Sequence, residues 1–96
     1  MSPVFLDTVG LLAVWNRNDQ WHSAAKRAFD ALSASERVLL TTTFALVECG
    51  NAAARRPFRH EVNVLRQRLE SASLLVIPTD ADWQLAWAAY DRGEAA

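Results

Sequence analysis

The chain has 96 residues, 51% of them hydrophobic, and a formal net charge of −1 at pH 7. This length suits one small domain, and the apolar content is sufficient for a packed core. No apolar run approaches the ~20 residues of a membrane-spanning helix, and the N-terminus lacks the pattern of a secretory signal. A single cysteine, Cys49, excludes an internal disulfide and a cysteine-based zinc site. We therefore expect one cytoplasmic domain over residues 1–96, without membrane association.

Three short apolar runs predict buried strands, and longer stretches between them predict helices. The predicted strands span residues 4–6, 38–40 and 73–77. The predicted helices span residues 8–15, 21–34 and 44–55, with a fourth after Pro57 and a fifth that starts at residues 79–82. Continuous apolar runs are typical of strands covered on both faces, and long crossovers join parallel strands. The sequence therefore predicts a three-layer α/β/α fold with a parallel sheet and the order β-α-α-β-α-α-β-α.

Apolar residues recur at helical spacing in three of the predicted helices, and we interpret each stripe as a core-facing side. The stripes are Trp21, Ala25, Ala28 and Leu32 in the second helix, Phe58, Val62, Leu65 and Leu69 in the fourth, and Trp83, Trp87 and Tyr90 in the fifth. Asp80 and Asp82 follow Thr79 at the start of the fifth helix, where negative charge suits the helix dipole. We interpret these two acids as capping residues.

The first strand leads directly into the carboxylate of Asp7. In open α/β sheets, ligands bind at the carboxyl ends of the strands, so Asp7 lies where a metal ion or a substrate could bind. Asp and Thr are also preferred N-capping residues. Asp7 or Thr8 could therefore serve only to start the following helix, and this segment alone leaves both interpretations open.

Glu48 is the second candidate acid, on the helix that follows the second strand. An ionised carboxylate among apolar neighbours is costly to bury unless it is paired or binds a cation. Alternatively, Glu48, Asn51 and Arg55 have the spacing of one solvated helix face. A helix that starts at the same sheet edge as Asp7 can direct Glu48 toward the same crevice. Two converging carboxylates favour a hard divalent cation such as Mg²⁺ or Mn²⁺.

Positive charge is concentrated between residues 55 and 68, which contain five arginines and His60, with Glu61 as the only acid. Clustered arginines can bind phosphates bidentately, although a solvated helix face gives the same pattern. The candidate contacts with RNA or a partner are Arg55, Arg56, Arg59 and Arg66.

Several common sites have no support in the sequence. Gly10 stands alone, so there is no glycine-rich phosphate loop, and no serine lies in a nucleophile-elbow pattern. His22 and His60 have no partners at metal-ligand spacing. A receiver-like domain with Asp7 as the phosphoacceptor has little support, because the additional acidic pair and a lysine on a late strand are missing.

The order of the remaining motifs resembles the PIN-domain family, and specifically its VapC-type toxin ribonucleases. The matching segments are residues 5–8, 42–48, 74–78 and 90–92. The resemblance implies a Mg²⁺- or Mn²⁺-dependent endoribonuclease that hydrolyses RNA through metal-activated water, commonly forms a homodimer and is inhibited by a cognate antitoxin. It also implies that Asp7 and Glu48 are the first two acids of the metal site and that Thr8 is the hydroxyl residue beside them.

The chain departs from this family pattern at its C-terminus. The family's third acid, and often a fourth, follow a segment like residues 90–92, beyond a further strand, and we do not interpret Asp91 as a ligand. The resemblance therefore implies a C-terminally incomplete PIN domain that binds metal poorly. It exposes a sheet edge that favours a homodimer or a swapped oligomer. The alternative function is an inactive PIN-like module that binds an antitoxin or another protein.

Overall fold

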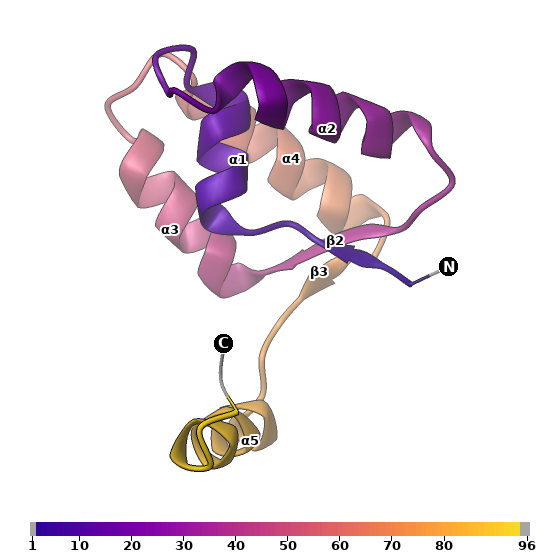
Figure 1. Cartoon of the computed structure of the whole chain (residues 1–96), viewed down its shortest axis with the longest axis vertical. Coiled ribbons are helices and arrows are strands. Elements are labelled where there is room, and N and C mark those ends of the chain that lie inside the picture. The colour runs from indigo at the N-terminus through magenta and orange to yellow at the C-terminus, as the bar shows by residue number, and fades with distance from the viewer. Residues whose placement is uncertain (1, 95–96) are drawn as a thin grey trace.

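The computed structural model describes residues 2–94 and has the predicted order of elements (Figure 1). The strands are β1 (Val4–Phe5), β2 (Leu39–Thr42) and β3 (Leu75–Val76). The helices are α1 (Thr8–Trp15), α2 (His22–Ala34), α3 (Thr43–Ala53), α4 (Arg59–Ser71) and α5 (Asp80–Asp91). The predicted α/β class and the order β-α-α-β-α-α-β-α are confirmed.

The strands form one parallel sheet in the order β1-β2-β3. Val4 pairs with Leu39, and Thr41 pairs with Leu75. The outer strands pair on one side only and are shorter than predicted, whereas β2 pairs on both sides and extends to Thr42. Because the strands are parallel, β1 and β2 end at the same edge of the sheet, and α1 and α3 begin there.

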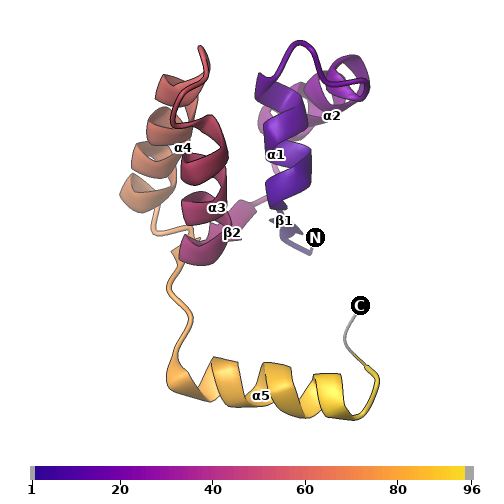
Figure 2. The same cartoon turned by 90° about the vertical axis from the view of Figure 1, so that its left-hand side faces the viewer.

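Helices α1 to α4 lie on one side of the sheet, and α5 stands apart on the other side (Figures 1 and 2). The strand side chains agree with this arrangement, because Leu39 and Thr41 are buried on the helical side, whereas Phe5 and Val76 are exposed. The sheet is therefore covered on one face by packed helices. The predicted third layer is represented only by α5, which does not pack against the strands.

The hydrophobic core lies between the sheet and helices α1, α3 and α4. Its buried residues are Leu6, Leu11, Leu39, Leu46, Cys49, Ala53, Val62, Leu65 and Leu69. The predicted stripe of α4 is confirmed, since Val62, Leu65 and Leu69 are buried and Phe58 packs against this core.

The predicted stripe of the second helix is confirmed in part, and that of the fifth helix is wrong. Leu32 of α2 packs against the core as predicted and Ala25 is partly buried, but Ala28 is exposed, as is Trp21, which precedes α2. Phe29, outside the predicted stripe, also packs against the core, so the core-facing side is rotated relative to the predicted one. In α5, none of the aromatic residues is buried. Helical spacing determines which residues share a face, but another element has to cover that face, and no part of residues 2–94 does so for α5.

A buried hydroxyl connects β2 to the end of β1. The Thr41 side chain is fully buried, and its Oγ1 donates to the carbonyl oxygen of Leu6 at 2.7 Å. We expect Thr41→Val to lower the free energy of unfolding by about 1–3 kcal/mol, because a buried carbonyl loses its donor. Urea denaturation measures this loss. Thr41→Ser keeps the hydroxyl and is the control, and equal stability of the Val variant and the wild type would contradict the assigned bond.

Candidate functional site

Asp7 lies at the sheet edge where β1 ends and is the N-cap residue of α1. Its backbone is extended, with φ −86° and ψ 151°, but its side chain makes no capping hydrogen bond to the described residues. Asp7 therefore occupies the N-cap position, as the capping alternative expects, but its exposed side chain does not cap the helix. Thr8 follows as the first helical residue, and its Oγ1 donates to the carbonyl oxygen of Ala45 at 3.5 Å.

Glu48 lies in the middle of α3, the helix that begins directly after β2. The start of α3 is fixed by Thr42, whose hydroxyl accepts a hydrogen bond from the backbone N–H of Ala45 at 3.1 Å. Glu48 is exposed, so the argument from the cost of burying its carboxylate is wrong. The alternative that Glu48, Asn51 and Arg55 form one solvated helix face therefore agrees with the structure.

The buried thiol of Cys49, next to Glu48 in the chain, has an altered pKa. Cys49 is fully buried, and its pKa is raised from 9.0 to about 11. Burial is the largest cause, followed by repulsion from Glu48 and then from Asp7, while a hydrogen bond with Thr8 acts in the opposite direction. The parallel topology places Asp7 and Thr8 beside α3, the helix that carries Glu48 and Cys49.

The raised pKa of Cys49 predicts a loss of stability at alkaline pH. Above pH 9 the thiol ionises in the unfolded chain, whereas in the folded chain it stays protonated up to about pH 11. Its contribution is therefore fully present below pH 9 and is lost as the pH rises to 11, by roughly 2–3 kcal/mol. Urea denaturation between pH 8 and 11 measures this loss. Cys49→Ala is the control, and an identical pH dependence in this variant would contradict the prediction.

The donor set at this edge is of the right kind for a hard cation, but it is small. Asp7 and Glu48 offer two carboxylates, and Mg²⁺ is typically bound through one or two carboxylates while it keeps several waters. Within residues 2–94, no group of three or more His, Cys, Asp or Glu side chains is placed to hold a metal ion. Asp7 and Glu48 are carboxylates, the kind of ligand that Mg²⁺ and Mn²⁺ prefer.

The candidate arginines lie away from these acids. Arg55 and Arg56 follow the last turn of α3, roughly 10 Å along the helix axis from Glu48. Arg59 begins α4. The Arg66 guanidinium pairs with Glu70 at 3.0 Å and donates to the side-chain oxygen of Asn63 at 3.0 and 2.7 Å. Arg66 is thus bound within its own helix, whereas Arg55, Arg56 and Arg59 are exposed.

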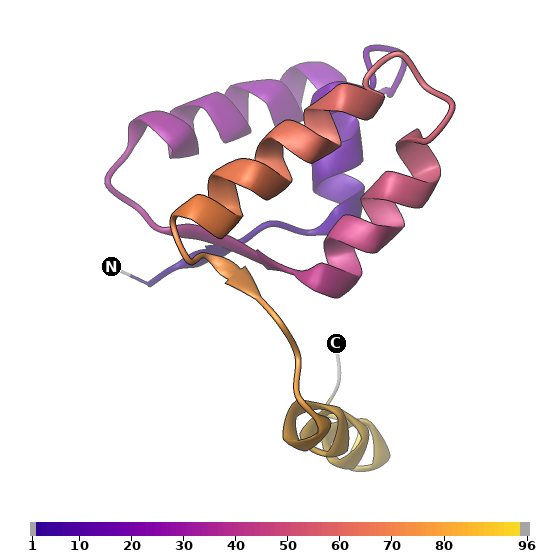
Figure 3. The same ribbon diagram turned by 180° about the vertical axis from the view of Figure 1, so that it is seen from behind.

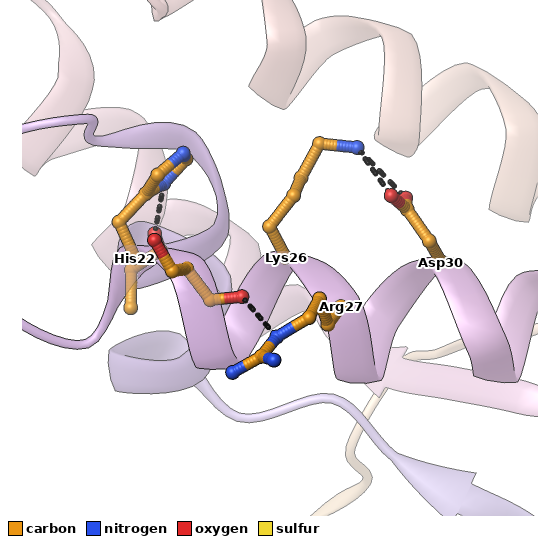
Figure 4. Close-up of polar contacts among 6 residues, drawn as sticks. His22, Lys26, Arg27 and Asp30 are labelled. Carbon is orange, nitrogen blue, oxygen red and sulfur yellow. Dashed lines mark hydrogen bonds and ion pairs between the residues drawn. The ribbon is translucent and has the colours of Figure 1, made fainter.

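A hollow of about 750 Å³ between the α1–α2 connection and the start of α4 was not predicted. Its walls include aromatic and cationic side chains that are distant in the sequence: Trp15, Phe29, Phe58, Arg17, Lys26 and Arg56. His22 also lines it, with Nδ1 bonded to the carbonyl oxygen of Ala13 at 2.9 Å, and Lys26 pairs with Asp30 at 2.8 Å (Figure 4). The imidazole of His22 and the ammonium group of Lys26 are therefore already engaged by other residues of the chain.

Comparisons with known proteins give no independent identification. No family model, curated protein or solved structure matches the chain. No helix within the described residues is both long enough and apolar enough to cross a membrane. The functional interpretation therefore depends on the residues of this chain and their arrangement.

Proposed function

We propose that the chain is a metal-dependent endoribonuclease of the VapC type, the toxin component of a toxin–antitoxin pair, with Asp7 and Glu48 as ligands of Mg²⁺ or Mn²⁺. The observation that carries this proposal is the contact between Thr8, which follows Asp7, and the carbonyl oxygen of Ala45 on α3, three residues before Glu48, with both carboxylates exposed. The order of motifs along the chain, which resembles the PIN-domain family, supports it. The proposed partners are RNA, a cognate antitoxin and a second copy of this chain.

The chain's own residues have separate roles in this mechanism. Asp7 and Glu48 hold the ion from two different helices, so their separation depends on how α1 packs against α3. Thr8 positions these helices through its contact with the carbonyl oxygen of Ala45. When bound, the divalent ion stabilises charge on the phosphodiester and lowers the pKa of a water molecule. Both carboxylates are exposed, so an RNA strand can reach this edge without a conformational change.

An RNA cleavage assay tests the proposal. A labelled single-stranded RNA is incubated with the protein in Mg²⁺, in Mn²⁺ and in EDTA. We expect cleavage with either ion and none in EDTA. Protein with both Asp7→Asn and Glu48→Gln, purified in the same way, controls for contaminating nucleases. Absence of cleavage with both ions, in protein that is folded by circular dichroism, would contradict enzymatic activity.

A non-catalytic interaction module is the second candidate. Two observations favour it: the site offers only two carboxylates, and α5 presents an exposed aromatic face. In this case the chain binds an antitoxin or another protein and cuts nothing. The same RNA assay separates the two candidates, because only the first gives ion-dependent products.

The exposed arginines predict the salt dependence of RNA binding. We expect the triple substitution Arg55→Gln, Arg56→Gln and Arg59→Gln to weaken binding and to reduce the slope of log Kobs against log salt by about 2, because each phosphate contact on a single strand contributes about 0.7. Arg66→Gln is the matched control, since its guanidinium is already bound to Asn63 and Glu70. Fluorescence anisotropy at several salt concentrations measures both slopes. An unchanged slope in the triple variant would assign these arginines to a solvated face.

A further inference from the structure

A narrow apolar slot of about 220 Å³ lies between α2 and α4. Figure 3 shows α4 in front of α2, with the strands below both helices. Leucines line this α2–α4 slot from the helices and from the sheet: Leu6, Leu32, Leu39, Leu65, Leu69 and Leu74. All of them belong to the hydrophobic core or pack against it. The slot is therefore an apolar space that continues the core.

Two buried polar atoms beside the slot have no hydrogen-bond partner among residues 2–94. They are Oγ of Ser33, on α2, and Nε of Arg37, in the segment between α2 and β2. Both residues line the slot. Buried polar groups are almost always hydrogen-bonded, so each exception requires an explanation, such as a bound ion or ligand. The two exceptions in the described part of the chain line the same slot, so one acceptor group could satisfy both.

The charged residues of the slot are arginines, and no acid among residues 2–94 lines it. Arg68 is exposed and Arg37 is half-buried, so both charges lie where the slot meets solvent. Arg37 donates through Nη2 to the carbonyl oxygen of Ser2 at 2.8 Å, which holds its guanidinium in place. Neither guanidinium forms an ion pair within the described residues. Two unpaired guanidinium groups at the mouth of an apolar space favour an anion.

Local structure accounts for only part of this arrangement. Arg68 lies in the last turn of α4, where a positive charge suits the helix dipole. This explanation does not extend to Arg37, which lies outside the helices, or to the hydroxyl of Ser33. Glu36, next to Arg37 in the sequence, is exposed and does not line the slot. The unpartnered donors therefore remain available to a ligand.

From these observations we propose that the α2–α4 slot binds a medium-chain aliphatic carboxylate, with its tail among the leucines and its headgroup beside Ser33, Arg37 and Arg68. A carboxylate has two acceptor oxygens, which match the two unpartnered donors. A cavity of about 150 Å³ lined by similar side chains is large enough to bind benzene. At roughly 30 Å³ for each heavy atom, the share of a water molecule in the liquid, the slot holds a tail of about seven carbons.

Such a ligand would connect two helices that the chain itself joins weakly. Helix α2 contributes no buried residue, so a tail that fills the slot gives α2 additional apolar contact with α4. A ligand that binds only the folded chain also raises its stability. The slot is separate from Asp7 and Glu48, so the outcome of this proposal does not depend on whether the chain cleaves RNA.

Isothermal titration calorimetry with straight-chain carboxylates tests the tail. We expect saturable binding of one octanoate per chain. From butanoate to octanoate, the dissociation constant should fall about fourfold for each added methylene, because each CH₂ group is removed from water. Longer carboxylates should gain nothing more, because their tails exceed the slot.

Two ligands with the tail of octanoate test the headgroup. Octanol should bind at least about 10-fold more weakly, because it cannot form hydrogen bonds to the arginines with a full negative charge. Octyl phosphate should also bind more weakly, because it brings more charge and a third oxygen to a site with two unpartnered buried donors.

Substitutions at the headgroup site provide an independent test. Arg68→Gln and Ser33→Ala should each raise the dissociation constant of octanoate at least about 10-fold, because each removes a hydrogen bond to a charged group. Without octanoate, Ser33→Ala should not lower the free energy of unfolding, since the hydroxyl that it removes has no partner. Arg27→Gln is the matched control, because it removes one positive charge from an exposed residue of α2 that does not line the slot.

Four results would overturn the proposal. The first is the absence of saturable octanoate binding at millimolar concentrations in folded wild-type protein, which would make the slot a packing gap. The second is equal affinity for octanol and octanoate, which would leave the unpartnered donors without a role. The third is an unchanged affinity in both Arg68→Gln and Ser33→Ala, which would place the ligand elsewhere. The fourth is tighter binding of octyl phosphate than of octanoate, which would assign the slot to another anion.

Discussion

Replacing Asp7 with Asn or Glu48 with Gln is expected to lower the kcat/KM of ion-dependent RNA cleavage at least about 100-fold. Each substitution keeps the size of the side chain but removes one of the two negative charges of the proposed metal site. Residues that only support a metal ligand already contribute 10–100-fold to affinity or activity, so loss of a ligand should have a larger effect. Initial rates at saturating Mn²⁺ measure the change, and Asp80→Asn on α5 is the control.

The same two variants also have a readout that does not require activity. Glu48 and Asp7 both raise the pKa of Cys49, so removal of either charge should lower that pKa toward its ordinary value. Thiol titration followed by ultraviolet absorbance measures the shift. The Asp7→Asn variant is the informative one, because Glu48 is the chain neighbour of Cys49. A lower pKa in this variant without an effect on cleavage would show that Asp7 lies near the thiol but is not catalytic, and an unchanged pKa would contradict its position beside α3.

Leu11→Ala is expected to cause the largest loss of stability among simple substitutions, about 2–5 kcal/mol. Leu11 is only 2% exposed and belongs to the core cluster. Its removal combines a lost transfer free energy with a cavity that the surrounding residues fill only in part. Domains of this size are typically stable by about 5–15 kcal/mol, so this change removes a large share. Urea denaturation measures it.

Val9→Ala is the matched control for Leu11→Ala. Val9 lies on the same helix and is 73% exposed. A surface substitution of this kind typically changes stability by less than about 0.5 kcal/mol. Equal losses in the two variants would mean that α1 is not anchored to the core through Leu11. Because α1 begins immediately after Asp7, the Leu11 variant should also weaken the effect of Asp7 on Cys49.

The sequence was sufficient to predict the order of the elements and the parallel sheet. Long crossovers between short apolar runs leave few other topologies, and the stripe of Val62, Leu65 and Leu69 was correctly assigned to the core. Which side of α2 faces the core could not be predicted in full. Ala28 and Phe29 are adjacent in the sequence, and only the position of the sheet decides which of them faces inward. For α5 the sequence predicts an apolar face but cannot tell whether the same chain covers it.

The site was predictable to a similar extent. Parallel strands that end at one edge bring Asp7 and the helix of Glu48 together, and this expectation depends on topology alone. The exposure of Glu48 depends on the rotation of α3 about its axis, which its mainly apolar sequence does not define. The bonds from Arg66 to Asn63 and Glu70 follow helical spacing and could have been anticipated. The 750 Å³ hollow could not, because its walls come from three separate segments.

Helix α5 starts with a capping box, in which the side chains of Thr79 and Asp82 each accept a hydrogen bond from the other residue's backbone N–H. This local start has a consequence for hydrogen exchange. A helix that starts from its own contacts, and that buries no residue of its own, can unfold without disturbing the core. Its amides should therefore exchange through local opening with a free energy close to zero, while the amides of α3 and β2 exchange only on global unfolding. The chain thus contains two units of unequal stability, and residues 77–79 form the boundary between them.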